Sequence, residues 1–543
     1  MQNNFLTLKI ESLPIDLNEA LVELESSQIL RRIWKLDHRI WKPDPKEITN
    51  RMGWLWIARH MLRNLDKIHT LVESVRSEGY QDIILLGMGG SSLAPEVFSK
   101  IFGKKKTYPQ LTVLDSTAAG AVKSITQKIE IKKTLFIVST KSGTTVETLS
   151  FFKYFYNFTL QQVGEEDAGT HFIAITDPGS KLENLARDHQ FREIFLNDPN
   201  IGGRYSALSY FGLVPAALVG VDIELILQRA IEMTHFDSLG ATLGTILGLA
   251  ANTGRDKLTF IITEAVHSFG DWVEQLIAES SGKEGKGILP VVSEPLGEPN
   301  VYGEDRLFIH IKLGETSEFS QGIEQLKVAG HPVVEIQLSD IYDLGKQLFL
   351  WEIATAIACC YLEVNPFDQP NVESAKVLAR HMVAEYQKEG KLPEVETADL
   401  DPEQLDAFLA NAAPGDYIAL QAYIEPTMQN TKALQDLRST LRDRYKLATT
   451  LGFGPRFLHS TGQMHKGDGG NGLFIQFVAQ SKQDIPIPDE AGKPGSSITF
   501  GTLIMAQALG DGQALTNENR RFVRFSLDAL ETARDIASLD DAK

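Results

Sequence analysis

Cysteine is scarce in this sequence, which has only Cys359 and Cys360 among its 543 residues. The two are neighbours within an apolar, helix-like pattern, so their side chains point to different helix faces and form a poor pair for a disulfide or a metal. The sequence also lacks a run of 18 apolar residues, the length of a membrane-spanning helix. Its first residues lack the basic and then apolar order of a secretion signal. We therefore expect a cytoplasmic protein with two buried thiols.

Several binding motifs are also missing. The formal net charge of −18 argues against a nucleic-acid partner, because binding to phosphate backbones depends on Lys and Arg. None of the 12 histidines lies in an HExxH motif and no CxxC is present, so no metal or other cofactor is expected. A small anionic ligand is still compatible with the charge, since distant charges are screened over about 8–10 Å.

The length of the chain and its alternating patterns predict the fold class. A chain of 543 residues exceeds one ordinary core, so two or three domains are expected. Apolar strands interleave with helical patterns in QDIILLG, LTVLDS, TLFIV and THFIAIT, and again in KLTFII, GILPVV, RLFIHIKL and HPVVEIQL. Such interleaving is typical of parallel sheets covered on both faces. We predict an α/β protein with two doubly wound parallel-sheet domains in series, followed by a C-terminal α/β section.

We expect four parts along the chain. Residues 1–60 form a helical arm packed on the first domain, and residues 61–235 and 236–385 form the two parallel-sheet domains. A polar, proline-bearing stretch then leads into residues 386–543, which we call the C-terminal region. There, DYIALQAYI, GLFIQFVAQ, SITFGTLIMAQAL and RRFVRFSL indicate at least three strands.

Two loops of the first domain follow strands and are rich in hydrogen-bond donors. In GMGGSS, residues 87–92, glycines allow backbone N–H groups to approach an anion and Ser91 adds a hydroxyl. This glycine loop is neither a dinucleotide fingerprint nor a P-loop. The second loop lies within STKSGTTVET at residues 139–148, where the four hydroxyls of Thr140, Ser142, Thr144 and Thr145 surround Lys141 and a glycine before a helix. We call residues 140–145 the phosphate loop, because helix N-terminal amides and hydroxyls favour an anion there.

Each of these loops and charges also has an ordinary structural explanation. A capping box, with Thr144 as N-cap and Glu147 three residues later, would use one hydroxyl of the phosphate loop and leave three unexplained. Arg204, after two glycines, is suited to stabilise an oxyanion or to form a surface ion pair. Glu279 lies at the end of an amphipathic helix, where charged side chains are usually solvated.

Five segments, taken together, resemble the glucose-6-phosphate isomerase family, whose members contain two sugar-isomerase (SIS) domains. GMGGSSLAP is similar to the glycine loop of that family and STKSGTTVET to its phosphate loop. GGRYSALS and NPFDQPNVESAK are similar to its two signature segments, and AESSGK to the segment with the catalytic glutamate. The matches occur in the family's order between Gly87 and Lys376.

The resemblance implies interconversion of glucose 6-phosphate and fructose 6-phosphate through a cis-enediolate. Glu279 would be the base, Arg204 would stabilise the enediolate, and Lys376 would assist ring opening. A carboxylate is a suitable base for a carbon acid only if a nearby donor stabilises the enediolate. The residues implied to contact the substrate are Gly90, Ser91, Thr140, Lys141, Ser142, Thr144, Thr145, Gly203 and Gln369.

The ring-opening histidine departs from the family pattern. The family carries it between the glutamate and the NPFDQ segment, where this chain has only His310 and His331, and we expect both to be structural. The later segment HSTGQMHKGDGG is similar to a displaced counterpart. His465 is the predicted ring-opening residue there, with His459 as the alternative. A solvated histidine in a flexible glycine loop is the ordinary explanation.

The late histidine segment also bears on assembly and substrate. With it, the chain resembles the isomerase half of proteins fused to transaldolase, although no segment resembles transaldolase and that activity is not expected. The family completes its site across a homodimer, so dimerisation is expected here. Two alternatives stay open: an isomerase that accepts mannose 6-phosphate or an amino-sugar phosphate, and a non-catalytic module that senses sugar phosphates.

Overall fold

The computed structural model describes residues 6–235, 237–394, 396–481, 483–528 and 531–539. The first of its sheets is entirely parallel. Its strand order is β3-β2-β4-β5-β6. Its strands are β2 (Asp82–Gly87), β3 (Gln110–Leu114), β4 (Thr134–Ser139), β5 (Phe172–Thr176) and β6 (Glu193–Leu196). The covering helices are α4 (Asp66–Ser77), α5 (Leu93–Phe102), α6 (Ala119–Lys128), α7 (Val146–Val163), α8 (Glu165–Ala168), α9 (Lys181–Asp188) and α10 (Tyr210–Leu218).

Both faces of this sheet are buried, as its unbroken apolar strands predicted. Ile83 and Leu85 of β2 belong to one apolar cluster with residues of α4, α5 and α10. Ile84 and Leu86 belong to another, with the phenylalanines of α7. Because side chains alternate along a strand, the two clusters lie on opposite faces, and the sheet is doubly wound.

The second sheet has the order β1-β10-β9-β7-β8 and is parallel except for its edge strand β1. Its strands are β1 (Leu6–Lys9), β7 (Lys257–Ile262), β8 (Leu289–Val291), β9 (Arg306–Leu313) and β10 (Val333–Leu338). The helices around it are α11 (Ile223–Met233), α12 (Asp237–Asn252), α13 (Phe269–Ser281), α14 (Ser320–Val328) and α15 (Leu344–Tyr361).

The N-terminal arm packs mainly on this second sheet rather than on the first domain. It contains helices α1 (Leu17–Ser26), α2 (Ile29–Trp34) and α3 (Trp54–Leu62), but it begins with β1, which pairs antiparallel with β10. Trp34 donates to Asp237 of α12, and Trp41 donates to the carbonyl of Ala356 in α15. The arm follows the second sheet because an open edge and apolar helices are available there.

The third sheet, in the C-terminal region, is parallel with the order β12-β11-β13-β16. Residues 497–509, which were expected to form a strand, contain only a short one before a long helix begins at the cap residue Thr499. The strands are β11 (Tyr417–Tyr423), β12 (Ala448–Phe453), β13 (Gly472–Ala479) and β16 (Arg521–Leu527), with a separate pair β14 (Pro486–Ile487) and β15 (Ile498–Thr499). The helices are α16 (Val372–Glu389), α17 (Pro402–Leu409), α18 (Met428–Tyr445), α19 (Gly462–Gly467), α20 (Phe500–Asn517) and α21 (Thr532–Ser538).

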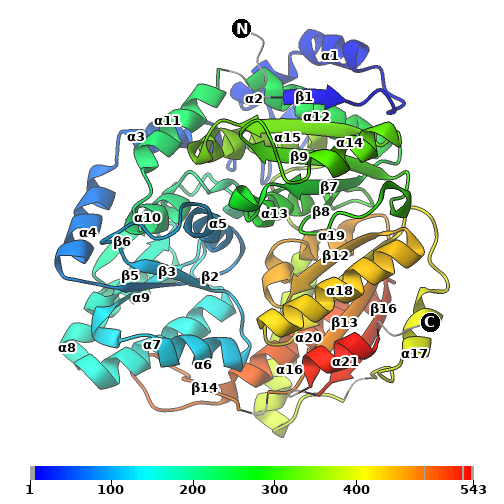
Figure 1. Cartoon of the computed structure of the whole chain (residues 1–543). Helices are drawn as coiled ribbons and strands as arrows, with labels where there is room; N and C mark the ends of the chain where they lie inside the picture. The colour runs from blue at the N-terminus through cyan, green and yellow to red at the C-terminus, as the bar shows by residue number, and fades with distance from the viewer. Residues whose placement is uncertain (1–5, 236, 395, 482, 529–530, 540–543) are drawn as a thin grey trace.

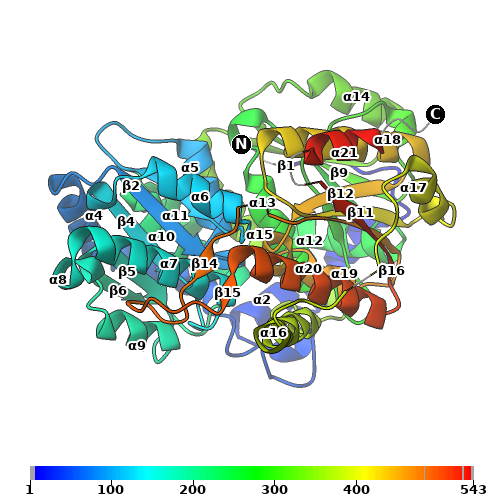
Figure 2. The ribbon, with the colours of Figure 1, turned by 90° about the horizontal axis from the view of Figure 1, so that it is seen from below.

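The three sheets surround a common centre. Figure 1 shows the first sheet in blue and cyan, the second in green apart from its blue edge strand β1, and the third in orange to red. The C-terminal region packs on the first sheet because Ile487, Phe500 and Leu503 join the apolar cluster around α7. Helix α16 lies beside α20, as Figure 2 shows. In the part of the chain that the structure describes, no helix is long and apolar enough to cross a membrane.

Candidate active site

The glycine loop passes from β2 into α5 through a tight turn that two other segments touch. Gly89 has a φ of +55°, and a Cβ there would lie 2.9 Å from the carbonyl oxygen of His459 and from Gln275 Nε2. A Cβ on Gly90 would lie 2.0 Å from the carbonyl oxygen of Gly203. These approaches require glycine, and they bring the segments of Gly203 and His459 against the loop that carries Ser91.

The phosphate loop presents hydroxyls and free helix amides after β4. Thr140 and Thr145 share a hydrogen bond of 2.9 Å between their Oγ1 atoms, and Ser142 bonds Thr144 at 2.7 Å. Thr145 is the N-cap residue of α7 and makes no side-chain capping bond, so the structure does not contain the capping box of Thr144 and Glu147. The first amides of α7 are therefore available to an anion.

Lys141 does not direct its ammonium into this group of hydroxyls. The ammonium pairs with Asp177 and donates to the carbonyl of Pro199 at 3.0 Å. Burial raises the pKa of Asp177, although Lys141 acts against that shift. The ammonium of Lys141 is held in an ion pair with Asp177. The backbone of Lys141, rather than its side chain, is therefore the part available to an anion in the phosphate loop.

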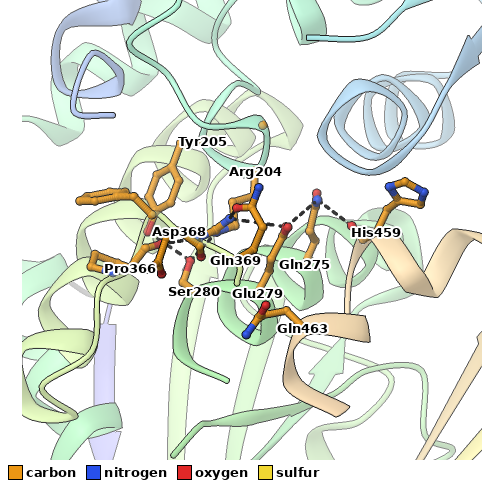
Figure 3. A network of polar contacts seen from close by, with 12 residues as sticks. Arg204, Tyr205, Gln275, Glu279, Ser280, Pro366, Asp368, Gln369, His459 and Gln463 are labelled. Atoms are coloured by element: carbon orange, nitrogen blue, oxygen red, sulfur yellow. Dashed lines mark hydrogen bonds and ion pairs between the residues drawn. The ribbon is translucent and has the colours of Figure 1, made fainter. Parts of the chain in front are cut away.

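Glu279 lies in the last turn of α13 and is held by one donor from its own helix. Gln275, one turn earlier, donates from Nε2 to Glu279 Oε2 at 3.0 Å and to the carbonyl of His459 at 2.7 Å. The Oε1 atom of Gln275 is buried without a partner among the described residues. Arg204 Nη1 lies 3.7 Å from Glu279 Oε2 (Figure 3). The Glu279 carboxylate thus faces the Arg204 guanidinium, and the bond from Gln275 sets the orientation of the carboxylate.

Arg204 is fixed by acceptors on two segments. Its Nε donates to Ser280 Oγ at 2.8 Å and its Nη1 to Gln369 Oε1 at 2.9 Å. Its Nη2 donates to the carbonyls of Pro366 and Asp368 at 2.6 and 3.0 Å (Figure 3). Because every branch of the guanidinium is engaged, it offers a preorganised positive charge beside the carboxylate.

Lys283 clamps the same NPFDQ segment from the other side. Its ammonium, which is buried, donates to the carbonyl of Asn365 at 2.7 Å and to the carbonyl and carboxylate of Asp368 at 2.6 and 2.8 Å. Burial, and then the charge of Arg204, lowers the pKa of Lys283 to about 8. The segment with Gln369 is therefore held by two cations.

His459, the alternative in the late histidine segment, reaches the site. Its Nε2 lies 3.1 Å from Glu147 Oε1, and among the described residues its Nδ1 has no hydrogen-bond partner. Gln507 of α20 donates to the same Glu147 oxygen at 2.7 Å and accepts from Thr117 at 2.8 Å. Burial raises the pKa of Glu147, but His459 and the more distant Lys376 outweigh it and the net pKa is lowered.

His465, the predicted ring-opening residue, is not brought to this cluster. It is 3% exposed within α19, between the rings of Phe457 and Phe474, with centroids 5.8 and 5.0 Å away. Its Nδ1 is 3.3 Å from Gln421 Nε2, and burial holds its pKa well below 6.5. The segment predicted as a glycine-rich loop is a short helix packed inside the C-terminal region, so His465 contacts Gln421 and two aromatic rings rather than Glu279 or Arg204.

Three residues of the site were not predicted from the sequence as site residues. Gln275 is recognisable as a polar residue four positions before Glu279, hence on the same helix face. Glu147 was expected only as a capping residue. Gln463, which is fully buried, donates to the carbonyl of Gly282 at 2.9 Å and to Asn371 Oδ1 at 2.7 Å, and accepts from the Asn371 amide at 2.8 Å. No local pattern marks Gln463, because all of its partners are far away in sequence.

The sequence and fold match known proteins over the same elements. A family model described as phosphoglucose isomerase matches residues 58–296, which include both donor loops, Arg204 and Glu279. A probable glucose-6-phosphate isomerase of Methanococcus maripaludis is 28% identical over 381 residues, covering 62% of this chain and 84% of the relative. The glucose-6-phosphate isomerase of Rubrobacter xylanophilus is 26% identical over 411 residues, covering 66% of this chain and 94% of the relative.

Two solved structures share the fold. A hypothetical protein from Thermus thermophilus has a TM-score of 0.60 with 24% identity, covering 70% of this chain and 100% of that chain. A glucose-6-phosphate isomerase from Chlamydia trachomatis has a TM-score of 0.59 with 18% identity, covering 72% of this chain and 90% of that chain.

The fold and the site define the class first. Two largely parallel sheets covered by helices, with Glu279 facing Arg204 beside the glycine loop, make this an α/β protein with an acid–base site between its sheets. The matched residues then narrow the class, because residues 58–296 match the phosphoglucose isomerase family model and both relatives are described as glucose-6-phosphate isomerases, one of them as probable. Gln369, Lys376 and His459 lie beyond the residues that the family model matches.

Proposed function

We propose that this protein interconverts glucose 6-phosphate and fructose 6-phosphate as an aldose–ketose isomerase. The observation that carries the proposal is the Glu279 carboxylate, which lies 3.7 Å from Arg204 Nη1 and is held by Gln275, itself against Gly89 of the glycine loop. The relatives named glucose-6-phosphate isomerase support the same reaction. The protein therefore has the carboxylate base and fixed cation that isomerisation through an enediolate needs.

The donor loops are proposed to bind the phosphate group. Hydroxyls and free amides at the start of α7 suit a dianion, and Lys141 contributes its backbone because its ammonium is paired with Asp177. A fixed phosphate supplies binding energy that orients the reacting carbons. The proposed substrate-contacting residues are Gly90, Ser91, Thr140, Lys141, Ser142, Thr144, Thr145, Gly203 and Gln369.

Glu279 is proposed to move a proton between the two reacting carbons. In the open-chain aldose it takes the proton from C2, the electron pair forms the C1–C2 double bond, and the C1 carbonyl oxygen becomes the enediolate oxygen. The same proton is then returned to C1, while the hydroxyl proton of O2 passes to O1 and leaves the C2 carbonyl. Arg204, fixed beside this position, stabilises the anion by roughly 3–4 kcal/mol, the usual contribution of one preorganised donor.

His459, in place of His465, is proposed to open the sugar ring. Its Nε2–H donates to Glu147, which leaves Nδ1 free to exchange protons with the ring oxygen and the C1 hydroxyl. Lys376 of α16 is proposed to assist that proton transfer, and its charge contributes to the lowered pKa of Glu147. This arrangement assigns the acid–base work of ring opening to the junction between the first sheet and the C-terminal region.

Assembly and location follow as separate proposals. Gln275, Glu279 and His459 are all contributed by one chain, so we propose that a single chain holds the acid–base groups. The homodimer implied by the family resemblance would then be needed for stability rather than for chemistry. A cytoplasmic location agrees with a substrate of central metabolism.

Replacing Glu279 with glutamine tests the function. The amide keeps the size of the side chain but cannot take a proton, so turnover of fructose 6-phosphate in a coupled assay should fall at least about 10³-fold. Binding of fructose 6-phosphate, measured by calorimetry, should change less than about threefold. The exposed Glu284, paired with Lys42, is the matched control, and E284Q should keep full turnover.

Turnover of the Glu279→Gln enzyme within tenfold of the unaltered enzyme would contradict the assignment of the base. The same assay, run with glucose, mannose and glucosamine 6-phosphates and with and without a chelator, measures the substrate range. A protein that binds sugar phosphates and turns none of them over would be a sensor rather than an isomerase.

A further inference from the structure

One arginine of the C-terminal region reaches carboxylates of both other domains. Arg456 pairs with Glu96 of α5, and its Nη1 lies 3.1 Å from Asp115, just after β3. Its Nη2 lies 3.5 Å from Asp271 in the first turn of α13. Lys100 also pairs with Glu96, at 2.9 Å. Arg456 is thus the meeting point of three parts of the chain.

Arg456 and its carboxylate partners are partly buried, so their ion pairs are expected to hold the three parts of the chain together. The residues line a cavity of about 490 Å³ at the junction of the three sheets, and the guanidinium side chain is 24% exposed. Burial raises the pKa values of Asp115 and Asp271, and the charge of Arg456 opposes that shift for each of them. Removing the guanidinium would leave three carboxylates facing one another, which is strongly unfavourable in a partly buried setting.

Two of the carboxylate partners, Asp115 and Asp271, are connected to different parts of the site. Asp115 accepts from Ser92 Oγ at 3.3 Å, next to the proposed phosphate-binding Ser91. Asp271 begins the helix whose last turn carries Glu279. Arg456 itself begins the short 3-10 turn Arg456–His459. The guanidinium therefore sets the distance between His459 and the two elements that would hold the substrate.

A second contact holds the other side of His459. Ser460 Oγ donates to Glu274 Oε1 at 3.1 Å, again on α13. The carbonyl of His459 accepts from Gln275, and its ring reaches Glu147. The backbone at His459 is thus tied at both flanks, and of these side chains Arg456 is the one that reaches α5 and α13 together.

We propose that Arg456 is a positioning residue for the ring-opening step, acting through His459 and not through Glu279. It holds the turn Arg456–His459 against α5 and α13, so that the imidazole meets Glu147 and the substrate ring together. The inference rests on the proposed function, because it assumes that His459 opens the ring.

Substitution of Arg456, combined with a deuterium isotope effect, tests this proposal. With deuterium at C2 of glucose 6-phosphate, a slower proton transfer raises the isotope effect on kcat/KM, and a slower ring opening lowers it toward 1. We expect R456M to lose about 10- to 100-fold in kcat/KM, as small misplacements of a catalytic group do, with an isotope effect near 1. R456K should lose less kcat/KM than R456M, because lysine keeps the positive charge although it lacks the planar guanidinium that reaches several carboxylates at once.

Arg442→Met is the matched control. Arg442 also joins the C-terminal region to the second domain, through the carbonyl of Pro295, but it does not contact the histidine turn. The R442M enzyme should keep the isotope effect of the unaltered protein, whatever its thermal stability. Combining R456M with H459N gives a second measurement, in which the loss caused by R456M should nearly disappear.

The outcomes separate the two proposals. An isotope effect that rises in R456M would show that Arg456 acts on Glu279, and an unchanged one would show a general structural role. Either result overturns the positioning role of Arg456, and so do losses of kcat/KM from R456M and H459N that are fully additive in the double variant. None of these results would contradict the proposed isomerase function. If R456M does not fold, R456K with the same isotope measurement decides. An unaltered protein without isomerase activity would instead overturn the proposed function itself.

Discussion

Exchanging the two histidines of the late segment for asparagine should affect different properties of the protein. His459 lies 3.1 Å from Glu147 with its Nδ1 free, whereas His465 is packed between two aromatic rings. Asparagine is close to histidine in size near the backbone but does not titrate between pH 5 and 8. The pair therefore compares an acid–base group with a packing group inside one short segment of the chain.

The magnitudes follow from these contacts. Loss of a positioned acid–base group costs about 10²- to 10⁴-fold in rate, so H459N should lose about that factor in kcat/KM. Its stability should change by only about 1 kcal/mol, because Glu147 keeps its bond to Gln507 at 2.7 Å. H465N loses two aromatic contacts and a partner for Gln421, and should be destabilised by about 1–3 kcal/mol with turnover within about threefold.

Two measurements on each variant distinguish the histidines. Turnover of glucose 6-phosphate, with and without deuterium at C2, reports ring opening, and thermal unfolding reports stability. H459N should give an isotope effect near 1 because ring opening has become the slow step. If H465N instead loses turnover 100-fold with unchanged stability, and H459N does not, then the assignment of His459 is wrong.

Two further predictions concern the glycine loop and the alkaline limb of the pH profile. G90A places a Cβ 2.0 Å from the carbonyl oxygen of Gly203 and should lower both kcat/KM, by at least about 10²-fold, and thermal stability, whereas G203A meets no atom within 4 Å and should keep its stability. Equal unfolding temperatures for the two alanine variants would contradict this account of the loop. Lys283, with a pKa lowered to about 8, loses one of its donors above that pH, so kcat/KM should fall as pH rises through about 8. Its contribution to the free energy of unfolding should rise between pH 8 and its ordinary value of 10.5, because there the unfolded chain binds more protons. If K283M keeps the same alkaline limb, another group causes it.

Much of the fold was predictable because its signals are local. Eight strands of the two parallel sheets were predicted from apolar runs followed by loops and helices, and all eight are present. Strand β6 has only four residues and β12 contains two threonines and a glycine, so neither stood out as an apolar run. Strand β1 was missed within a segment expected to be helical, because the strand with which it pairs is β10, more than three hundred residues away.

The residues of the site likewise divide into those with a local signal in the sequence and those without one. The phosphate loop, Arg204 and Glu279 follow strands or end helices in short segments whose composition is distinctive, and the structure brings Arg204 within 3.7 Å of Glu279. The glycine-rich segment in which His465 follows Gly462 and Gln463 favours His465 over His459, but Gly462, Gln463 and His465 belong to a packed helix. The partner of His459 is Glu147, 312 residues away, and no local pattern connects the two.

Most of the strands and helices, the donor loops and the family resemblance can be obtained from the amino-acid sequence, because periodicity and composition act over a few neighbouring residues. Long-range packing determined the rest: which histidine meets the carboxylates, where the arm packs, and that Arg456 joins three parts of the chain. Those outcomes depend on contacts between residues hundreds of positions apart, whose distances are set by the packing of whole sheets and helices rather than by any local pattern.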